Sequence, residues 1–138
     1  MTRLGAAALA VALLACGCGG PQRPREVRAR LTPPRGCVVK VFFATSLMSG
    51  REATQREVRS VRARIQSSTR IRSFAFVSKR LALRRMQRLH PGLFGGLPGN
   101  PLPPSFELVP RSTGDAAVLA RELRDARGVE HVSASQAC

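Results

Sequence analysis

The stretch Cys37-Val-Val-Lys-Val-Phe-Phe-Ala44 determines how the rest of the chain is interpreted. Its β-branched and aromatic residues lie between glycine and hydroxyl residues, which is the pattern of a β-strand. Val39, Val41 and Phe43 alternate onto one face, while valine and phenylalanine also occupy the other face. Because apolar residues point to both sides, we expect this strand to be covered on both faces.

The segments downstream alternate between helical and strand periodicity. Over residues 51–67, apolar side chains and a threonine recur at the spacing of an amphipathic helix, with arginines mainly between them. The further segments are a strand over 70–77, a helix over 79–89, a strand over 105–109, a helix opened by Ser112 and stopped at Gly128, and a strand over 129–133. The order is β-α-β, an inserted helical lobe with its hinge at 78–104, and β-α-β.

This order predicts an α+β fold of the ferredoxin-like split βαβ type, in which helices pack on one face of an antiparallel sheet. The first and last strands of that sheet are antiparallel neighbours. Cys37 begins the first strand and Cys138 follows the last one. In an oxidising compartment we therefore expect a disulfide between them. The alternative is two unpaired cysteines near frayed ends.

The N-terminal segment predicts export. Residues 1–15, MTRLGAAALAVALLA, hold one cation and then an apolar run that is too short for a bilayer span of roughly 20 residues. Leu13-Leu14-Ala15-Cys16 resembles the lipobox of bacterial lipoproteins, which predicts a signal peptide over 1–15 and a lipid on Cys16. Ordinary cleavage is the alternative. Residues 16–36 are rich in Gly, Pro and Arg, so we expect a flexible tether before the domain at 37–138.

The formal net charge is +15, from 23 Lys and Arg against 8 Asp and Glu. Nucleic acid is the usual partner of such a chain, but export and the absence of Trp and Tyr, which would stack on bases, argue against it. Two interpretations remain. The arginines either solvate helix faces or attract anionic lipid or wall polymers.

Catalytic chemistry has little support in the sequence. His90 lies in a Pro-Gly loop and His131 in a strand, and neither has the neighbours of a general base. No Cys and His spacing is typical of a zinc site, and no glycine-rich loop follows a strand in the manner of a phosphate site. We therefore expect no enzyme activity, no cofactor and no metal.

Several of these segments together resemble the extracellular domain of the FtsX family, which are permease-like bacterial cell-division proteins. The resemblance covers about residues 37–133. It is carried by Val39–Phe43, by Phe76-Val-Ser-Lys79, by Asn100-Pro-Leu-Pro103 with Ser-Phe two residues on, and by Gly128-Val-x-x-Val132. The resemblance implies an extracytoplasmic, non-catalytic domain that binds a peptidoglycan hydrolase or its activator.

The same resemblance implies a partner-binding surface on the helical lobe. By position it falls on Met86, Leu89, Leu93, Phe94 and Leu97. Exposed apolar residues with a charged rim are typical of a docking surface. The alternative is that the loop leucines and Phe94 fold back over the helix as a small core of their own. The partner's identity, the membrane leaflet, the oligomeric state and the role of Cys18 stay open.

Overall fold

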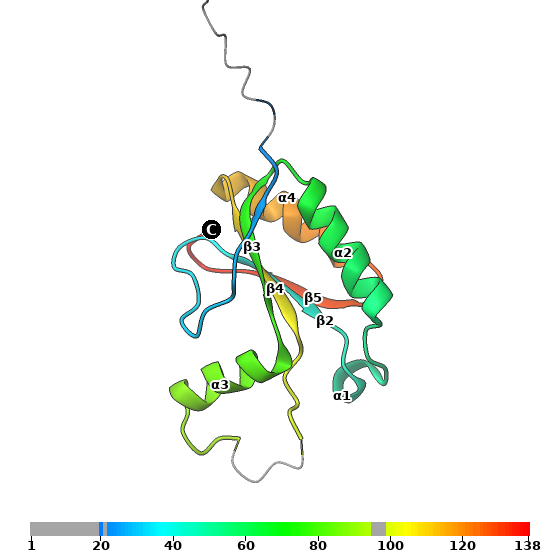
Figure 1. Cartoon of the computed structure of the whole chain (residues 1–138), viewed down its shortest axis with the longest axis vertical. Helices are drawn as coiled ribbons and strands as arrows, with labels where there is room; N and C mark the ends of the chain where they lie inside the picture. Colours follow the sequence, from blue (N-terminus) through cyan, green and yellow to red (C-terminus); the bar gives the residue numbers. More distant parts are fainter. Residues whose placement is uncertain (1–19, 21, 95–98) are drawn as a thin grey trace, which may run out of the picture.

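The computed structural model describes residues 20, 22–94 and 99–138, in which five strands form one sheet of order β1-β3-β4-β2-β5 (Figure 1). The elements in chain order are β1 (Arg25–Glu26), β2 (Val39–Phe43), α1 (Ser46–Ser49), α2 (Gln55–Ser67), β3 (Ile71–Val77), α3 (Lys79–Leu89), β4 (Ser105–Pro110), α4 (Thr113–Arg124) and β5 (Val129–Ala134).

The four longer strands have the predicted split βαβ arrangement. β2 lies between β4 and β5 and pairs antiparallel with both, and β3 pairs antiparallel with β4. α2 and α4 supply Val61, Ile65, Leu119 and Leu123 to the core, so they cover one face of the sheet. The ferredoxin-like prediction is confirmed by this strand order and by the single core that both helices share.

Aromatic packing fixes the centre of this core. Phe106 on β4 is fully buried, and the rings of Phe43, Phe74 and Phe76 meet its ring at centroid distances of 5.6, 6.0 and 5.2 Å, all near edge-on. Edge-to-face pairs add about 0.5–1.5 kcal/mol each beyond the burial of their surface. Phe106 therefore joins three strands across the sheet.

The first long helix begins later than its periodicity suggests. Thr54 caps α2 and forms a reciprocal capping box with Glu57, so the helix starts at Gln55 rather than at residue 51. The hydrogen bond from Arg51 and that from the Thr54 backbone lower the pKa of Glu57 to about 2. The residues ahead of the cap form a loop that follows α1, a short helix that the sequence pattern did not predict.

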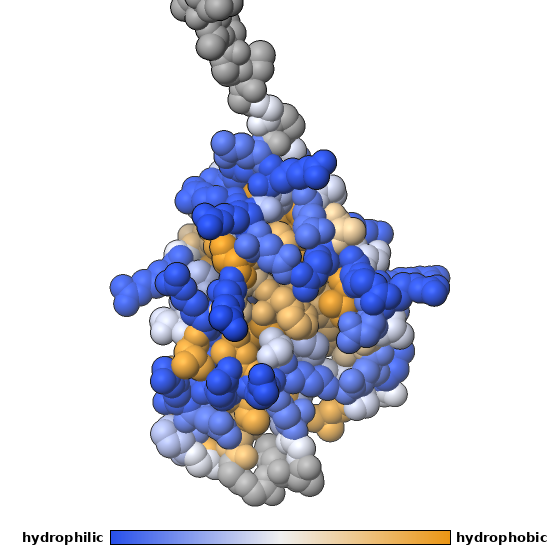
Figure 2. All heavy atoms as spheres, in the orientation of Figure 1, coloured by the Kyte–Doolittle hydropathy of each residue, from blue (hydrophilic) through white to orange (hydrophobic). Residues whose placement is uncertain are grey.

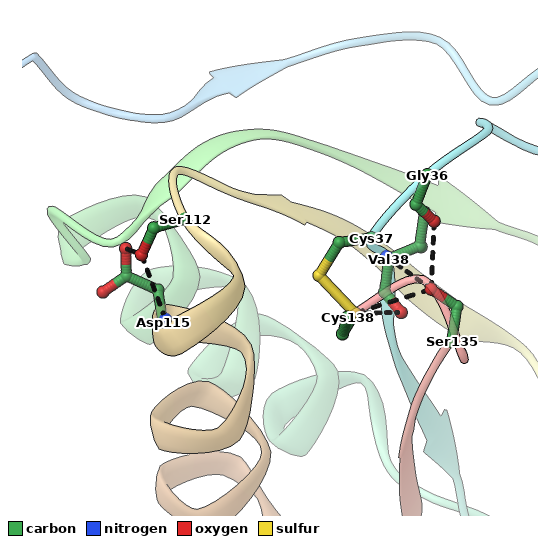
Figure 3. Close-up of a disulfide and its surroundings, with 7 residues drawn as sticks. All are labelled: Gly36, Cys37, Val38, Ser112, Asp115, Ser135 and Cys138. Carbon is green, nitrogen blue, oxygen red and sulfur yellow. Dashed lines mark hydrogen bonds between the residues drawn. A yellow bond between two sulfur atoms is a disulfide. The ribbon is translucent and has the colours of Figure 1, made fainter.

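A disulfide closes the domain at one edge of the sheet (Figure 3). Cys37 and Cys138 are joined, with their Cα atoms 4.4 Å apart, as the antiparallel neighbourhood of β2 and β5 predicts. Ser135 strengthens the same corner, since its hydroxyl accepts from the Val38 amide at 3.0 Å and donates to the Gly36 carbonyl at 3.0 Å. The two ends of the domain are therefore held side by side.

Part of the expected tether is ordered against the sheet. We call residues 22–36 the strap. Arg25 and Glu26 form β1, which pairs parallel with β3, and the Val27 amide donates to the Phe74 carbonyl at 2.8 Å. The strap runs beside β3, bends near α3 and returns to the start of β2 (Figure 1). The predicted flexible tether therefore does not extend to residue 36.

All core residues lie between positions 38 and 132, and all described hydrogen bonds lie within residues 22–138. A fragment of residues 20–138 retains every contact described here. The predicted lipid site at Cys16 and the loop residue Leu97 lie outside the described residues.

Candidate docking lobe

The lobe, residues 78–104, extends from the end of the sheet farthest from the start of the strap (Figure 1). Ser78 caps its helix, because the side chain accepts a hydrogen bond from the Leu81 amide at 3.3 Å. The helix ends at Leu89 with His90 as its C-cap, and Pro91 and a turn at positive φ on Gly92 follow. Ser78 therefore starts α3 in the place where the sequence predicts a helix.

A polar side chain fastens the hinge to the start of α3. Asn100 donates from Nδ2 to the Lys79 carbonyl at 2.6 Å, and its Oδ1 accepts from the Leu102 amide at 3.0 Å. The Lys79 amine also contacts Glu52 at 2.5 Å. The N-terminal end of α3 is thus held on both sides.

The middle of α3 is tied to the sheet by a buried ion pair. Arg85 Nη1 and Nη2 donate to the two carboxylate oxygens of Glu107 on β4 at 2.7 and 3.2 Å. The two residues are only 8% and 4% exposed. Lys40 lies 3.9 Å from the same carboxylate, and Arg85 Nε also donates to the carbonyl of Arg30 in the strap at 2.8 Å. The sequence shows many arginines, but it does not show which one is buried.

The structure divides the predicted docking residues into two groups. Leu89 and Leu93 are 68% and 63% exposed, whereas Met86 and Phe94 are half-buried. Neither a fully exposed loop nor a closed small core describes the lobe. Two large apolar side chains face solvent and two are partly covered, which leaves exposed apolar surface at the C-terminal end of α3 and in the turn that follows.

Sequence reasoning missed a second exposed apolar pair. Leu47 and Met48 on α1 are 74% and 64% exposed, and α1 lies toward the same end of the molecule as α3 (Figure 1). In Figure 2, apolar surface appears in the lower part of the molecule and is bordered by hydrophilic side chains. The signal in the sequence was two large apolar residues between serines, ahead of Gly50.

The charges on α3 follow the side away from its apolar stripe. Arg80, Arg84 and Arg88 are exposed and spaced by four residues, while Met86 and Leu89 lie on the opposite side of the helix. The described part of α3 contains no acidic residue. Like charges at this spacing destabilise a helix by about 0.2–0.5 kcal/mol per pair, so the row is not explained by helix stability.

Each histidine has a local structural position: one caps a helix, and the other stacks on an aromatic ring. His90 ends α3, and the His131 ring stacks on Phe42 at a centroid distance of 6.2 Å. Among the described residues, no group of His, Cys, Asp and Glu is arranged to hold a metal ion, and no helix has the length and apolar character of a membrane span.

Two solved structures have a similar fold. One is extracellular domain 1 of FtsX from Streptococcus pneumoniae in complex with undecyl-maltoside, with 15% identity, a TM-score of 0.54, and coverage of 74% of this chain and 97% of that one. The other is the large extracellular loop of FtsX from Streptococcus pneumoniae in solution, with 13% identity, a TM-score of 0.52, and coverage of 71% and 98%. No curated protein matches the sequence.

A family model also matches the sequence, over most of its length. The model of the FtsX extracellular domain matches residues 37–138, from the first disulfide cysteine to the second. The matched segment contains β2 to β5, α1 to α4 and the lobe, and therefore both halves of the split βαβ fold. The chain belongs to the FtsX extracellular domain family.

Proposed function

We propose that this protein is a non-catalytic envelope lipoprotein that binds a peptidoglycan hydrolase, or a regulator of one, through its lobe during cell division or wall remodelling. Membership of the family supports an extracytoplasmic cell-division domain of regulatory type. The observation that carries the proposal is the exposure of Leu89 and Leu93 at the end of α3.

Exposed apolar residues of this size favour a protein partner. Scattered single leucines are normal on protein surfaces, but a contiguous apolar patch is typical of an interaction site. Here Leu89 and Leu93 are exposed and close in sequence, and Met86 and Phe94, within three residues of them in the sequence, are partly covered. Apolar and aromatic side chains at the centre of an interface supply most of its binding energy. The proposed contact surface is therefore Met86, Leu89, Leu93, Phe94 and Leu97.

The position of the strap indicates how the lobe would be oriented relative to a membrane. We propose that Cys16 carries lipid and holds the protein on the outer side of a membrane. The strap begins at the end of the molecule opposite the lobe (Figure 1). A protein anchored through its N-terminal segment would then direct the lobe away from the lipid surface, toward the wall.

A related domain has been crystallised with an amphiphile. The extracellular domain of Streptococcus pneumoniae FtsX forms a complex with undecyl-maltoside, whose alkyl chain is apolar. This supports the proposal that domains of this fold offer apolar surface to a ligand. In this protein we assign that surface to the lobe.

Affinity capture tests the proposal. The oxidised fragment 20–138 is immobilised and exposed to envelope extract at about 0.15 and 0.5 M salt, where screening lengths are about 8 and 4 Å. A Leu89→Asp/Leu93→Asp variant is compared with Ala63→Asp/Ala117→Asp. The control adds the same charge at exposed positions on α2 and α4.

The expected result is a peptidoglycan hydrolase, or a regulator of one, that is retained at high salt, lost with the leucine variant and kept by the alanine control. The same specificity must hold with the purified partner. If the leucine variant captures that partner as well as the parent does, the lobe is not the docking surface.

A second candidate function is binding of anionic wall polymer or membrane surface. The row of Arg80, Arg84 and Arg88, for which the described residues show no ion pair, favours it. Binding of this kind falls steeply with salt. Capture that disappears at about 0.5 M salt in parent and leucine variant alike would support the second function over the first.

A further inference from the structure

A buried arginine links three segments that are far apart in the sequence. The guanidinium of Arg85 in the lobe contacts both carboxylate oxygens of Glu107 on β4 and, through Nε and Nη2, the carbonyl oxygen of Arg30 in the strap. A buried guanidinium requires acceptors for its five N–H groups. Glu107 supplies one side of the fork, and the strap carbonyl supplies the other.

The rest of α3 makes this contact important for the lobe. Leu81 and Arg85 are the buried residues of the helix. The links through Asn100 and Glu52 both act at Lys79, at the start of the helix. Arg85 lies six residues further along, about 9 Å at 1.5 Å per residue. Without the contacts of Arg85, the polar links that remain are at Lys79, so α3 can pivot about its N-terminal end.

The strap itself is held by contacts that can be broken separately from the core. β1 has two residues, fewer than a stable strand pair needs. Apart from the Arg85 contact, the strap is held by the Val27–Phe74 backbone hydrogen bond, the partly exposed ion pair of Glu26 with Arg62, and hydrogen bonds to its two ends, from Arg111 to the Gln22 carbonyl and from Ser135 to the Gly36 carbonyl. No core residue lies in the strap. The strap can therefore leave the sheet while the core remains folded.

We propose that the strap regulates the docking lobe. When it is seated, the Arg30 carbonyl completes the hydrogen bonding of Arg85 and holds α3 against the sheet. When it is displaced, Arg85 loses this acceptor, and its pair with Glu107, which lines the same cavity as the strap, opens to water. The hold on the middle of α3 is then weaker, so the helix pivots about Lys79 and presents Leu89 and Leu93 differently to a partner. This inference rests on the docking function proposed above. Since the strap joins the domain to the N-terminal segment, the state of the lobe depends on how that segment is held.

Amide hydrogen exchange tests the coupling without any partner. Fragment 20–138 is compared with fragment 37–138, which keeps the whole core and the disulfide but lacks the strap. We expect amides in the second half of α3 to exchange about tenfold faster or more without the strap, which corresponds to the loss of a hydrogen bond to a charged group. Amides of β2 and β4 should keep their rates.

A point variant removes the dependence on truncation. Val27→Pro in fragment 20–138 deletes the N–H group that donates to Phe74 and so unseats the strap with the chain length unchanged. It should speed exchange in α3 as truncation does. Arg84→Met, an exposed neighbour of Arg85, is the matched control and should leave α3 exchange unchanged.

Two outcomes would overturn the inference. If both strap perturbations leave α3 exchange unchanged, the strap does not hold the lobe. If β4 amides accelerate by the same factor as α3 amides, the strap stabilises the domain as a whole and has no specific effect on the lobe. Partner capture by the Leu89→Asp/Leu93→Asp variant fails or succeeds independently of both, so loss of docking and loss of coupling are separate results.

Discussion

Replacing Arg85 with methionine should strongly destabilise the protein. The substitution keeps most of the side-chain length and removes the charge, which leaves the Glu107 carboxylate buried at 4% exposure. Its remaining cation is Lys40, 3.9 Å away and itself 38% exposed. Removing one partner of a buried ion pair typically costs about 3–5 kcal/mol. Because Lys40 offsets part of this cost, we expect a loss of about 3 kcal/mol in the free energy of unfolding.

The assay is urea unfolding of oxidised fragment 20–138 followed by circular dichroism, with Arg84→Met as the control for an exposed arginine. The control should change the free energy of unfolding by less than about 0.5 kcal/mol. The double variant Arg85→Met/Glu107→Leu should recover most of the loss, because an apolar replacement of both partners leaves no buried charge. A single-variant cost below about 1 kcal/mol would refute the reasoning and show that water reaches the pair.

Three further predictions concern the fold. Gly128→Ala should lower the free energy of unfolding by about 2–4 kcal/mol, because φ is +85° and a Cβ would lie 2.7 Å from Glu57 Cβ. Gly50→Ala, at φ +71° in open space, should lower it less in the same urea assay. Stability should fall as pH drops from about 4.5 toward about 2, because Glu57 has a lowered pKa in the folded state; Glu57→Gln should flatten this part of a pH titration, and an unchanged slope would contradict the assignment. Reducing the disulfide between Cys37 and Cys138, which spans 101 residues, should lower the free energy of unfolding by at most about 4–5 kcal/mol. Equal urea midpoints with and without reductant would show that the disulfide does not stabilise the fold.

Local periodicity was sufficient to predict the main elements of the domain. The runs around Val41, Phe74 and Phe106 alternate as strands, and Ser112 caps a helix at the expected place. The pairing of the outer cysteines also followed from strand order. These features depend on neighbours in sequence or on the topology that those neighbours determine.

The parts that the sequence did not predict depend on contacts at long range. Arg25 and Glu26 are charged and carry no strand periodicity, and their place is set by β3 and by Arg62 on α2. Arg85 is one of several arginines in α3, and only the position of Glu107 in the folded sheet distinguishes it. The same limit applies to the lobe. The apolar residues of the lobe could be identified from the sequence, but the sequence did not show which of them face solvent.

The meeting of the two domain ends has a consequence for how this fold can be used. Residues 37 and 138 bound the segment that matches the family, and their Cα atoms lie 4.4 Å apart, close to the 3.8 Å between consecutive residues. A unit with such ends can be inserted into a surface turn of a host protein without stretching either chain. The same core can therefore form a large loop of a longer protein, as in FtsX of Streptococcus pneumoniae, or be joined to other segments at one end only. A change between these two arrangements requires new connections at one corner and no change in the packing.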